Sequence, residues 1–419
     1  MEKNNIANLF KGDKVVWIVF FLLCMVSIIE VFSASSELTY KSGDYLAPIL
    51  KHLALLGIGF VFMVCMMRIP CKYFKTFTYP LLLFSFVTLI AVIFVAKSVN
   101  GSQRWLGPIQ PSEFAKLAVV LATAQILSAM QTPTGAAKGA FKYVMWIMVP
   151  FVLLIGRENL STGLLLFATV ITMMFLGRVP SLQLGKLITV LVLMGGLLFG
   201  ATMAFGHDKR TETPAQQELV QAKEKKEDRG HIYKILSRLD TWKARWDDFT
   251  NKQYVAPEKF DLNEDAQVGH ANIAIATSNI IGKGPGKSVE RDFLPQAFSD
   301  FIYAIIIEEL GLLGAIVVAA LYIILLVRAS LIARRCKNNF PAFLVMGLSI
   351  LMVFQALFNM GVAVGVLPVT GQPLPLVSKG GNSTVLSCVY IGIILSVSRS
   401  AQRRDKDVQP LKAVVEGEK

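Results

Sequence analysis

The stretch FLPQAFSDFIYAIIIEELGLLGA, from Phe293 to Ala315, places three carboxylates in or just before a long apolar run. Asp300 lies at the start of the run, and Glu308 and Glu309 lie inside it. Acidic side chains are almost never fully buried in a soluble protein unless they are paired. Inside a membrane helix they cost still more, and they usually mark a functional site or a pairing between helices. The role of these acids therefore depends on whether the protein is soluble or spans a membrane.

The composition of the chain is typical of a membrane protein. Of the 419 residues, 54% are hydrophobic and 17% are charged, whereas a soluble domain has roughly 25% charged residues. Apolar runs of about twenty residues, the length that crosses a bilayer as a helix, recur along the sequence. We therefore predict an all-α polytopic membrane protein. Its ten expected spans lie near residues 14–34, 49–68, 77–96, 113–130, 143–157, 160–177, 184–206, 301–328, 341–363 and 383–398.

Lysine and arginine in the short loops predict the orientation, because these residues concentrate on the cytoplasmic side. Most of them fall on the side of the two termini, so both ends are expected in the cytoplasm, with residues 399–419 as a tail. The polar segment 207–299 is then a large extracytoplasmic loop between spans seven and eight, within a single membrane domain of residues 1–419. The net charge of +13 follows largely from this bias and favours a membrane with anionic lipids over nucleic acid as a partner.

The large loop contains two segments of interest. Apolar residues recur at helical spacing in QAKEKKEDRGHIYKILSRLDTWKARWDDF, Gln221 to Phe249, which predicts an amphipathic helix. This helix would lie on the membrane surface or serve the function of the loop. The run GKGPGKS, Gly282 to Ser288, lacks the first glycine of a Walker loop because Ile281 stands there. Its backbone and Lys283 can approach a phosphate-bearing group, or the run is a plain solvated loop.

A polar stretch precedes the fourth span. In NGSQRWLGPIQPSEFAKLA, Asn100 to Ala118, Pro111 and Ser112 are typical of a helix start, with Ser112 as the N-cap. Glu113 and Lys116 lie three residues apart on one face of that helix. They form a local ion pair or belong to a site, and a lysine one turn inside a membrane helix is a functional candidate by default.

Two further outer segments carry candidate binding groups. Arg104 and Trp105 can clamp a phosphate and stack on a sugar, although a tryptophan of the interfacial aromatic belt is the alternative for Trp105. The Pro/Gly-rich loop NMGVAVGVLPVTGQPLPLVSKGGNST, Asn359 to Thr384, predicts broken backbone, which a membrane protein tolerates where it lines a shielded cleft. We expect Ser378 and Lys379 of this loop to contact substrate.

Asp300 and Glu308 are not expected to act as an acid–base pair on the same glycosidic bond. A separation of eight residues along a helix puts Asp300 and Glu308 about 12 Å apart, beyond the roughly 5–9.5 Å between the two carboxylates of a glycosidase. Ser299 or Asp300 could simply cap the helix that follows. Glu308 and Glu309 lie deeper, and we expect them to pair with lysine or arginine and to stabilise the bundle.

Three of these stretches, RWLGPIQPSEFAKL, GKGPGKSVERDFLPQAFSDFIYAIIIEELG and GVLPVTGQPLPLVSKGGNS, resemble the SEDS proteins, the FtsW/RodA family. The resemblance extends over nearly the whole chain, and NMGVAVGVLPVTGQPLP is closer to the FtsW branch than to the RodA branch. It implies an inverting peptidoglycan glycosyltransferase of cell division, which polymerises lipid II at the outer face of the bacterial cytoplasmic membrane, at the septum, and releases undecaprenyl diphosphate. A RodA-like elongation polymerase and a lipid II flippase are the alternatives.

The resemblance also implies residues and partners. The essential aspartate of the family falls on Asp300, and its basic and acidic cleft residues fall on Arg104, Glu113 and Lys116. The implied partner is a class B penicillin-binding protein, together with other divisome proteins. The chain departs from the family pattern at Lys379, where an aromatic residue is frequent, and at Glu158–Asn159, where Pro-Asp is frequent.

The chemistry of glycan extension fits the candidate residues. An attacking hydroxyl needs a base, for which Asp300 is suited, and a diphosphate leaving group needs cations such as Arg104, Lys116 or Lys283. The sequence contains no metal-ligand cluster, and a Mg²⁺ or Mn²⁺ ion is an alternative source of positive charge. A flippase would need polar groups across the whole bilayer, for which Glu30 and the deep acids are the candidates.

Small residues in spans eight and nine predict where the partner docks. Gly311, Ala315 and Ala319 recur at four-residue spacing, as do Gly361 and Gly365. Such spacing lets helix backbones approach closely in lipid, within the bundle or against a partner helix. We expect the penicillin-binding protein to contact these two spans and the large outer loop.

Overall fold

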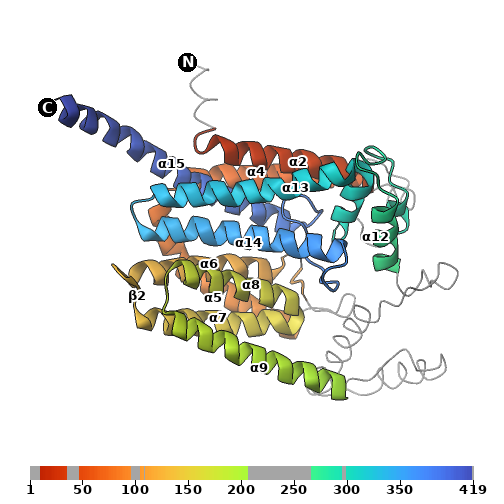
Figure 1. The fold of residues 1–419 in the computed structure, drawn as a ribbon, viewed down its shortest axis with the longest axis horizontal. Coiled ribbons are helices and arrows are strands. Elements are labelled where there is room, and N and C mark those ends of the chain that lie inside the picture. The colour runs from red at the N-terminus through yellow and green to blue at the C-terminus, as the bar shows by residue number, and fades with distance from the viewer. Residues whose placement is uncertain are drawn as a thin grey trace. The chain divides into compact units, whose positions relative to one another are not determined.

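A computed structural model provides the structure of the protein. It describes residues 10–34, 47–95, 104–107, 109–205, 266–294 and 299–417. The described chain is helical throughout its membrane part, which confirms the all-α prediction (Figure 1). The predicted amphipathic helix, residues 221–249, lies outside the described residues. A short hairpin of β1 (Gln131–Thr132) and β2 (Gly135–Ala136) joins two of the helices.

Each predicted span coincides with one described helix. Eight of the helices are long and apolar enough to cross a membrane, and α8 and the Ser181–Leu193 part of α9 are shorter apolar helices. The chain is therefore a multi-pass membrane protein. The last helix continues well beyond its predicted span, so part of the expected tail is helical. The ten helices are α2 (Lys14–Ala34), α4 (Ala47–Arg68), α5 (Phe74–Val95), α6 (Pro111–Ala129), α7 (Lys138–Glu158), α8 (Leu160–Leu176), α9 (Ser181–Phe205), α13 (Ile302–Arg335), α14 (Asn339–Ala363) and α15 (Asn382–Gly417).

The chain divides into two compact units. The first comprises Met1–Ser181, Leu262–Gly365 and Thr370–Lys419, and the second comprises Leu182–Asp261 with Val366–Val369. Nearly all of α9 belongs to the second unit. All of the predicted site residues belong to the first unit, which also contains α12 (Ala266–Ala276) and the 3₁₀ turns η1 (Cys71–Tyr73) and η4 (Glu290–Asp292).

Glycines bring the helices of the first unit close together. A Cβ on Gly59 of α4 would lie 2.7 Å from the Sγ of Cys388 in α15, and one on Gly392 of α15 would lie 2.5 Å from the backbone oxygen of Met63 in α4. The two helices thus meet through a glycine on each side. In lipid there is no hydrophobic driving force between helices, so close van der Waals packing through small residues stabilises such crossings.

Helix α13 is broken at Gly311, which has φ 70° and ψ −174°. The loop before the helix supplies the missing backbone partners. Leu312 N–H donates to Asn279 O (3.4 Å) and Leu313 N–H to Ile280 O (3.2 Å). In return, Glu308 O accepts from Lys283 N–H (3.0 Å) and Glu309 O from Gly284 N–H (2.8 Å). The sequence predicted one continuous span here, and this interruption was missed.

Two predicted helix caps are wrong. The N-cap of α6 is Gln110, with Pro111 at the first helical position, so Ser112 lies inside the helix. The N-cap of α13 is Phe301, and its side chain makes no capping hydrogen bond, so neither Ser299 nor Asp300 caps this helix. The role of Asp300 is therefore to be found in contacts other than a helix cap.

Candidate active site

The carboxylate of Asp300 and the guanidinium of Arg104 converge on Gly371. A Cβ built on Gly371 would lie 3.5 Å from Oδ2 of Asp300 and 3.5 Å from Nη1 of Arg104, so the two groups are no more than about 7 Å apart. Gly371 has φ +67°, a conformation that favours glycine. Asp300 and Arg104 are both half-buried. The absence of a side chain at Gly371 therefore lets an acid and a cation approach the same point of the loop backbone.

A polar scaffold fixes the backbone on either side of the Asp300 side chain. Asn359 of α14 donates from Nδ2 to Asp300 O and to Gln372 O, both at 2.8 Å. The hydroxyl of Ser378 donates to Ser299 O (2.6 Å) and accepts from Leu374 N–H (2.8 Å). Ser378 is thus buried and acts within the scaffold. Ser299 Oγ donates to Asp300 Oδ1 at 2.9 Å, which orients the carboxylate.

Glu113 and Lys116 form a buried anchor beneath the same loop. The ammonium of Lys116 lies 2.8 Å from Glu113 Oε1 and donates to Gln355 Oε1 at 2.8 Å. Gln355 in turn donates from Nε2 to Pro373 O (3.0 Å). Lys116 is 0% exposed, so its geometry fits positioning of the loop better than direct contact with substrate. Gln355, Asn359 and Gln372 were not predicted. For Gln355 and Asn359, a buried amide within an apolar helix is itself a signal.

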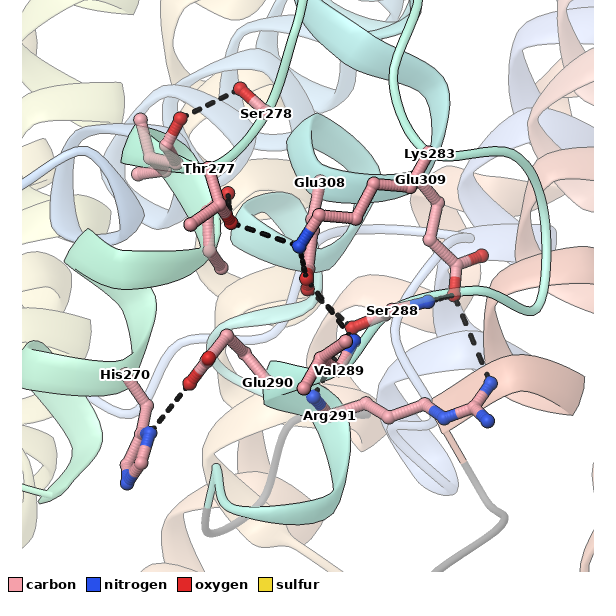
Figure 2. Close-up of polar contacts among 12 residues, drawn as sticks. His270, Thr277, Ser278, Lys283, Ser288, Val289, Glu290, Arg291, Glu308 and Glu309 are labelled. Atoms are coloured by element: carbon pink, nitrogen blue, oxygen red, sulfur yellow. Dashed lines mark hydrogen bonds and ion pairs between the residues drawn. The ribbon is translucent and has the colours of Figure 1, made fainter.

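Glu308 is enclosed by the glycine-rich loop (Figure 2). It is 0% exposed, and its Oε1 lies 2.6 Å from the Lys283 ammonium and accepts from Val289 N–H at 3.1 Å. Its Oε2 accepts from the Ser288 hydroxyl. Lys283 also donates to Thr277 Oγ1 at 3.0 Å. Lys283, predicted to bind substrate, is therefore engaged in folding the loop around a deep acid.

Glu309 binds the same loop and the first span. It accepts from Gly286 N–H (2.9 Å), Ser288 N–H (3.2 Å) and the hydroxyl of Ser33 in α2. The guanidinium of Arg291 lies 4.0 Å away and donates to Ser33 Oγ at 2.9 Å (Figure 2 shows the Arg291–Glu309 contact). The two glutamates thus tie the outer loop to α13 and α2.

A cleft adjoins the Arg104 side of the site. It is small, with a cavity volume of about 20 Å³, and it is partly open to the outside. Apolar groups on its walls are Leu89, Val92, Leu154 and Ile155, and its polar lining is Arg104, Ser112, Glu158 and Asn159. Asn159 caps α8 by accepting from Ser161 N–H and Thr162 N–H, a role that asparagine fills as well as the aspartate frequent in the family. Trp105 lies nearby in the sequence and is 41% exposed.

The site combines a candidate base, a cation and an apolar cleft. A half-buried carboxylate can accept a proton, and a guanidinium can bind a phosphate through two hydrogen bonds. An apolar wall beside such a cation suits a lipid-linked anion. Among the described residues, no group of three or more His, Cys, Asp or Glu could hold a metal ion. Fold and site together define a multi-pass membrane protein with an acid–cation centre built on broken helices and loops.

Comparison with known proteins identifies the family. Residues 13–403 match the FtsW/RodA/SpoVE family, described as "Cell cycle protein". The chain belongs to this family. It is 30% identical over 384 residues to the "Probable peptidoglycan glycosyltransferase FtsW" of Pseudomonas fluorescens, covering 89% of this chain and 84% of that protein. It is 26% identical over 402 residues to the "Peptidoglycan glycosyltransferase MrdB" of Escherichia coli K12, covering 94% of this chain and 96% of that protein.

Solved structures share the fold. A chain from a study of the structural coordination of polymerisation and crosslinking by a peptidoglycan synthase complex has a TM-score of 0.65 at 23% identity, covering 94% of this chain and 99% of that one. The rod shape determining protein RodA of Thermus thermophilus has a TM-score of 0.61 at 21% identity, covering 94% of this chain and 98% of that one. These likenesses confirm the polytopic fold predicted from the sequence.

Proposed function

We propose that this protein is a peptidoglycan glycosyltransferase that polymerises lipid II, with an FtsW-like role in cell division. The observation that carries the proposal is the convergence of Asp300 and Arg104 on Gly371, beside a partly apolar cleft. Relatives named as peptidoglycan glycosyltransferases along most of the chain support the same activity, and those named FtsW favour the division role over elongation.

The reaction can be written with the residues at the site. A sugar hydroxyl of the acceptor attacks the anomeric carbon of the donor, and its proton passes to the carboxylate of Asp300. The new glycosidic bond forms as the bond from the anomeric carbon to the diphosphate oxygen breaks, with inversion. Arg104 stabilises the charge that develops on the departing undecaprenyl diphosphate.

The remaining predicted residues support this centre. Glu113 and Lys116 hold the loop that contains Gly371, and Ser378 holds the backbone next to Asp300. Trp105 is exposed and suited to stack on a sugar. A Mg²⁺ or Mn²⁺ ion would be brought mainly by the diphosphate itself and would add to the charge of Arg104.

The proposed setting is the bacterial cytoplasmic membrane at the division septum, with both termini in the cytoplasm. The proposed partners are a class B penicillin-binding protein and other divisome proteins. The similar fold in a peptidoglycan synthase complex supports the first of these. Gly311 and Ala315 are buried by this chain itself, so internal packing occupies that part of the small-residue stripe. A partner helix on α13 would instead meet exposed side chains such as Leu312, Ile316 and Val317.

Polymerisation of purified lipid II tests the proposal. The purified protein, alone and with its penicillin-binding protein, is incubated with lipid II, and glycan strands are separated by gel electrophoresis. We expect strands whose amount rises when the partner is present. The same preparation in vesicles is assayed for movement of lipid II between leaflets. Transport of lipid II without any polymer would reject the enzyme and support a flippase.

A further inference from the structure

Basic side chains from two elements gather on another part of the loop that carries the site. Lys51 and His52 lie in the first turns of α4, and Lys379 follows the scaffold residue Ser378. The hydroxyl of Ser27 in α2 lies 2.9 Å from His52 Nε2 and donates to Val377 O at 2.7 Å. Ser27 therefore ties α2, α4 and the loop together and holds the segments that carry Lys51 and Lys379 against each other.

The local electrostatics indicate that the two lysines are neighbours. Burial lowers the pKa of the Lys379 ammonium, and the positive charge of Lys51 lowers it further. Because the Ser27 hydroxyl gives its proton to Val377 O, His52 Nε2–H must donate to Ser27. His52 is 2% exposed, and its Nδ1 makes no hydrogen bond within the described part of the chain. Nδ1 is then an acceptor, and a buried acceptor left in this state is costly unless a donor such as a water molecule reaches it.

The proposed reaction, on which this inference rests, requires two anions. Donor and acceptor are both linked to lipid through a diphosphate. The donor diphosphate leaves from the reacting carbon on the face opposite the attacking hydroxyl, so its cation must lie across the sugar ring from the base. The acceptor diphosphate is separated from its reacting hydroxyl by the length of a disaccharide, so it needs a different cation. Arg104, which approaches the Asp300 carboxylate, suits the donor.

We propose that Lys51 and Lys379 form a second diphosphate subsite, which binds the lipid-linked acceptor while Asp300 takes the proton from its hydroxyl. The Ser378–Ser299 hydrogen bond links this subsite directly to the backbone beside Asp300. Lys379 stands where an aromatic residue is frequent in the family, so this chain would bind its acceptor through charge at a position where relatives have a ring. His52 and Ser27 are positioning residues, since they fix α4 against the loop.

Kinetics of the purified complex test the subsite. Lys51→Gln and Lys379→Gln each remove one cation, and Lys287→Gln removes one from an exposed position elsewhere in the outer loop. We expect the KM for lipid II to rise about tenfold for each of the first two, with kcat changed by less than about twofold, because a charge-assisted contact made in both ground and transition state is lost. Lys287→Gln should match wild type, and Lys379→Arg should retain a near-normal KM. A merely structural role would lower kcat or the folded fraction, and arginine would not rescue it.

A binding assay distinguishes the source of the anion. Undecaprenyl diphosphate is titrated into the complex in nanodiscs of zwitterionic lipid, and the titration is repeated with phosphatidylglycerol in the disc. Weaker binding by both Gln variants in both discs supports the subsite. A normal KM and normal binding in both variants would overturn it, as would a defect that occurs only when phosphatidylglycerol is present. If wild type makes no polymer, the proposed function fails, and the binding comparison still decides the subsite.

Discussion

At the scale of single residues, Gly371 is the position on which the site depends most directly. Its positive φ disfavours any side chain, and a methyl group there would contact both the Asp300 carboxylate and the Arg104 guanidinium at 3.5 Å. Neither contact is a clash. The expected damage is therefore a small displacement of the Asp300 carboxylate and the Arg104 guanidinium, added to a local backbone strain of about 1–2 kcal/mol.

We predict that Gly371→Ala lowers lipid II turnover by about tenfold or more, because a misplacement of about 1 Å at a reacting centre can cost a hundredfold. The matched control is Gly381→Ala, which also has a positive φ (+52°) but has no atom within 4 Å of the added Cβ. It should suffer similar strain and keep its turnover. Equal losses of turnover in the two variants would show that strain alone explains the effect.

The sequence predicted some of these residues and missed others for a physical reason. Asp300 and Arg104 stand out because charged groups at the mouth of a membrane bundle are rare and costly. Gly371 and Gln372 do not stand out, since their roles depend on contacts between segments far apart in the chain. Asn359 was missed although a buried amide in an apolar helix is a signal. Lys116 and Lys283 were identified as candidates by their charge. The sequence spacing already offered Glu113 as a partner of Lys116, whereas only the fold shows that Lys283 is paired with Glu308.

At the scale of elements, the break in α13 connects the outer loop to the bundle. Gly311 and Gly282 pack backbone to backbone, and a Cβ on Gly311 would lie 2.3 Å from Ile280 O. Periodicity and apolar length predicted the ten helices well, because each must span a fixed thickness of hydrocarbon. They could not predict this break, since an apolar segment with one glycine also fits a continuous helix.

We predict that Gly311→Ala destabilises the folded protein by about 3 kcal/mol or more, because backbone atoms must move and φ is positive. The control is Gly57→Ala in α4, whose Cβ would have no atom within 4 Å. Alanine favours a helix by about 1 kcal/mol over glycine, so this variant should be neutral or slightly more stable. The fraction of monodisperse protein that survives heating in detergent is measured by size-exclusion chromatography. Equal survival of Gly311→Ala and wild type would contradict the backbone contact.

Across the whole molecule, polymerisation outside the cell requires the loop with Lys283 and the start of α13 to face outward. We predict that a single cysteine at Lys287, in a cysteine-free background, reacts with an impermeant thiol reagent added to spheroplasts. A single cysteine at Lys337, at the opposite end of α13, should react only after lysis. Both side chains are exposed in the structure, so access depends on the membrane alone. The reverse pattern would place Asp300 on the cytoplasmic side and exclude polymerisation outside the cell.

The most direct test of the central claim compares lipid II polymerisation by purified wild-type, Asp300→Asn and Glu308→Gln complexes at equal concentrations of folded protein. Asparagine preserves the shape of Asp300 and can still accept the hydrogen bond from Ser299, but it cannot take up the proton. We expect Asp300→Asn to fold, to bind its partner and to lose turnover by about a hundredfold or more. Glu308→Gln should reduce the yield of folded protein, because Lys283 loses its buried partner, and should leave the turnover of the folded fraction near wild type. Near-normal polymerisation by Asp300→Asn would contradict the account.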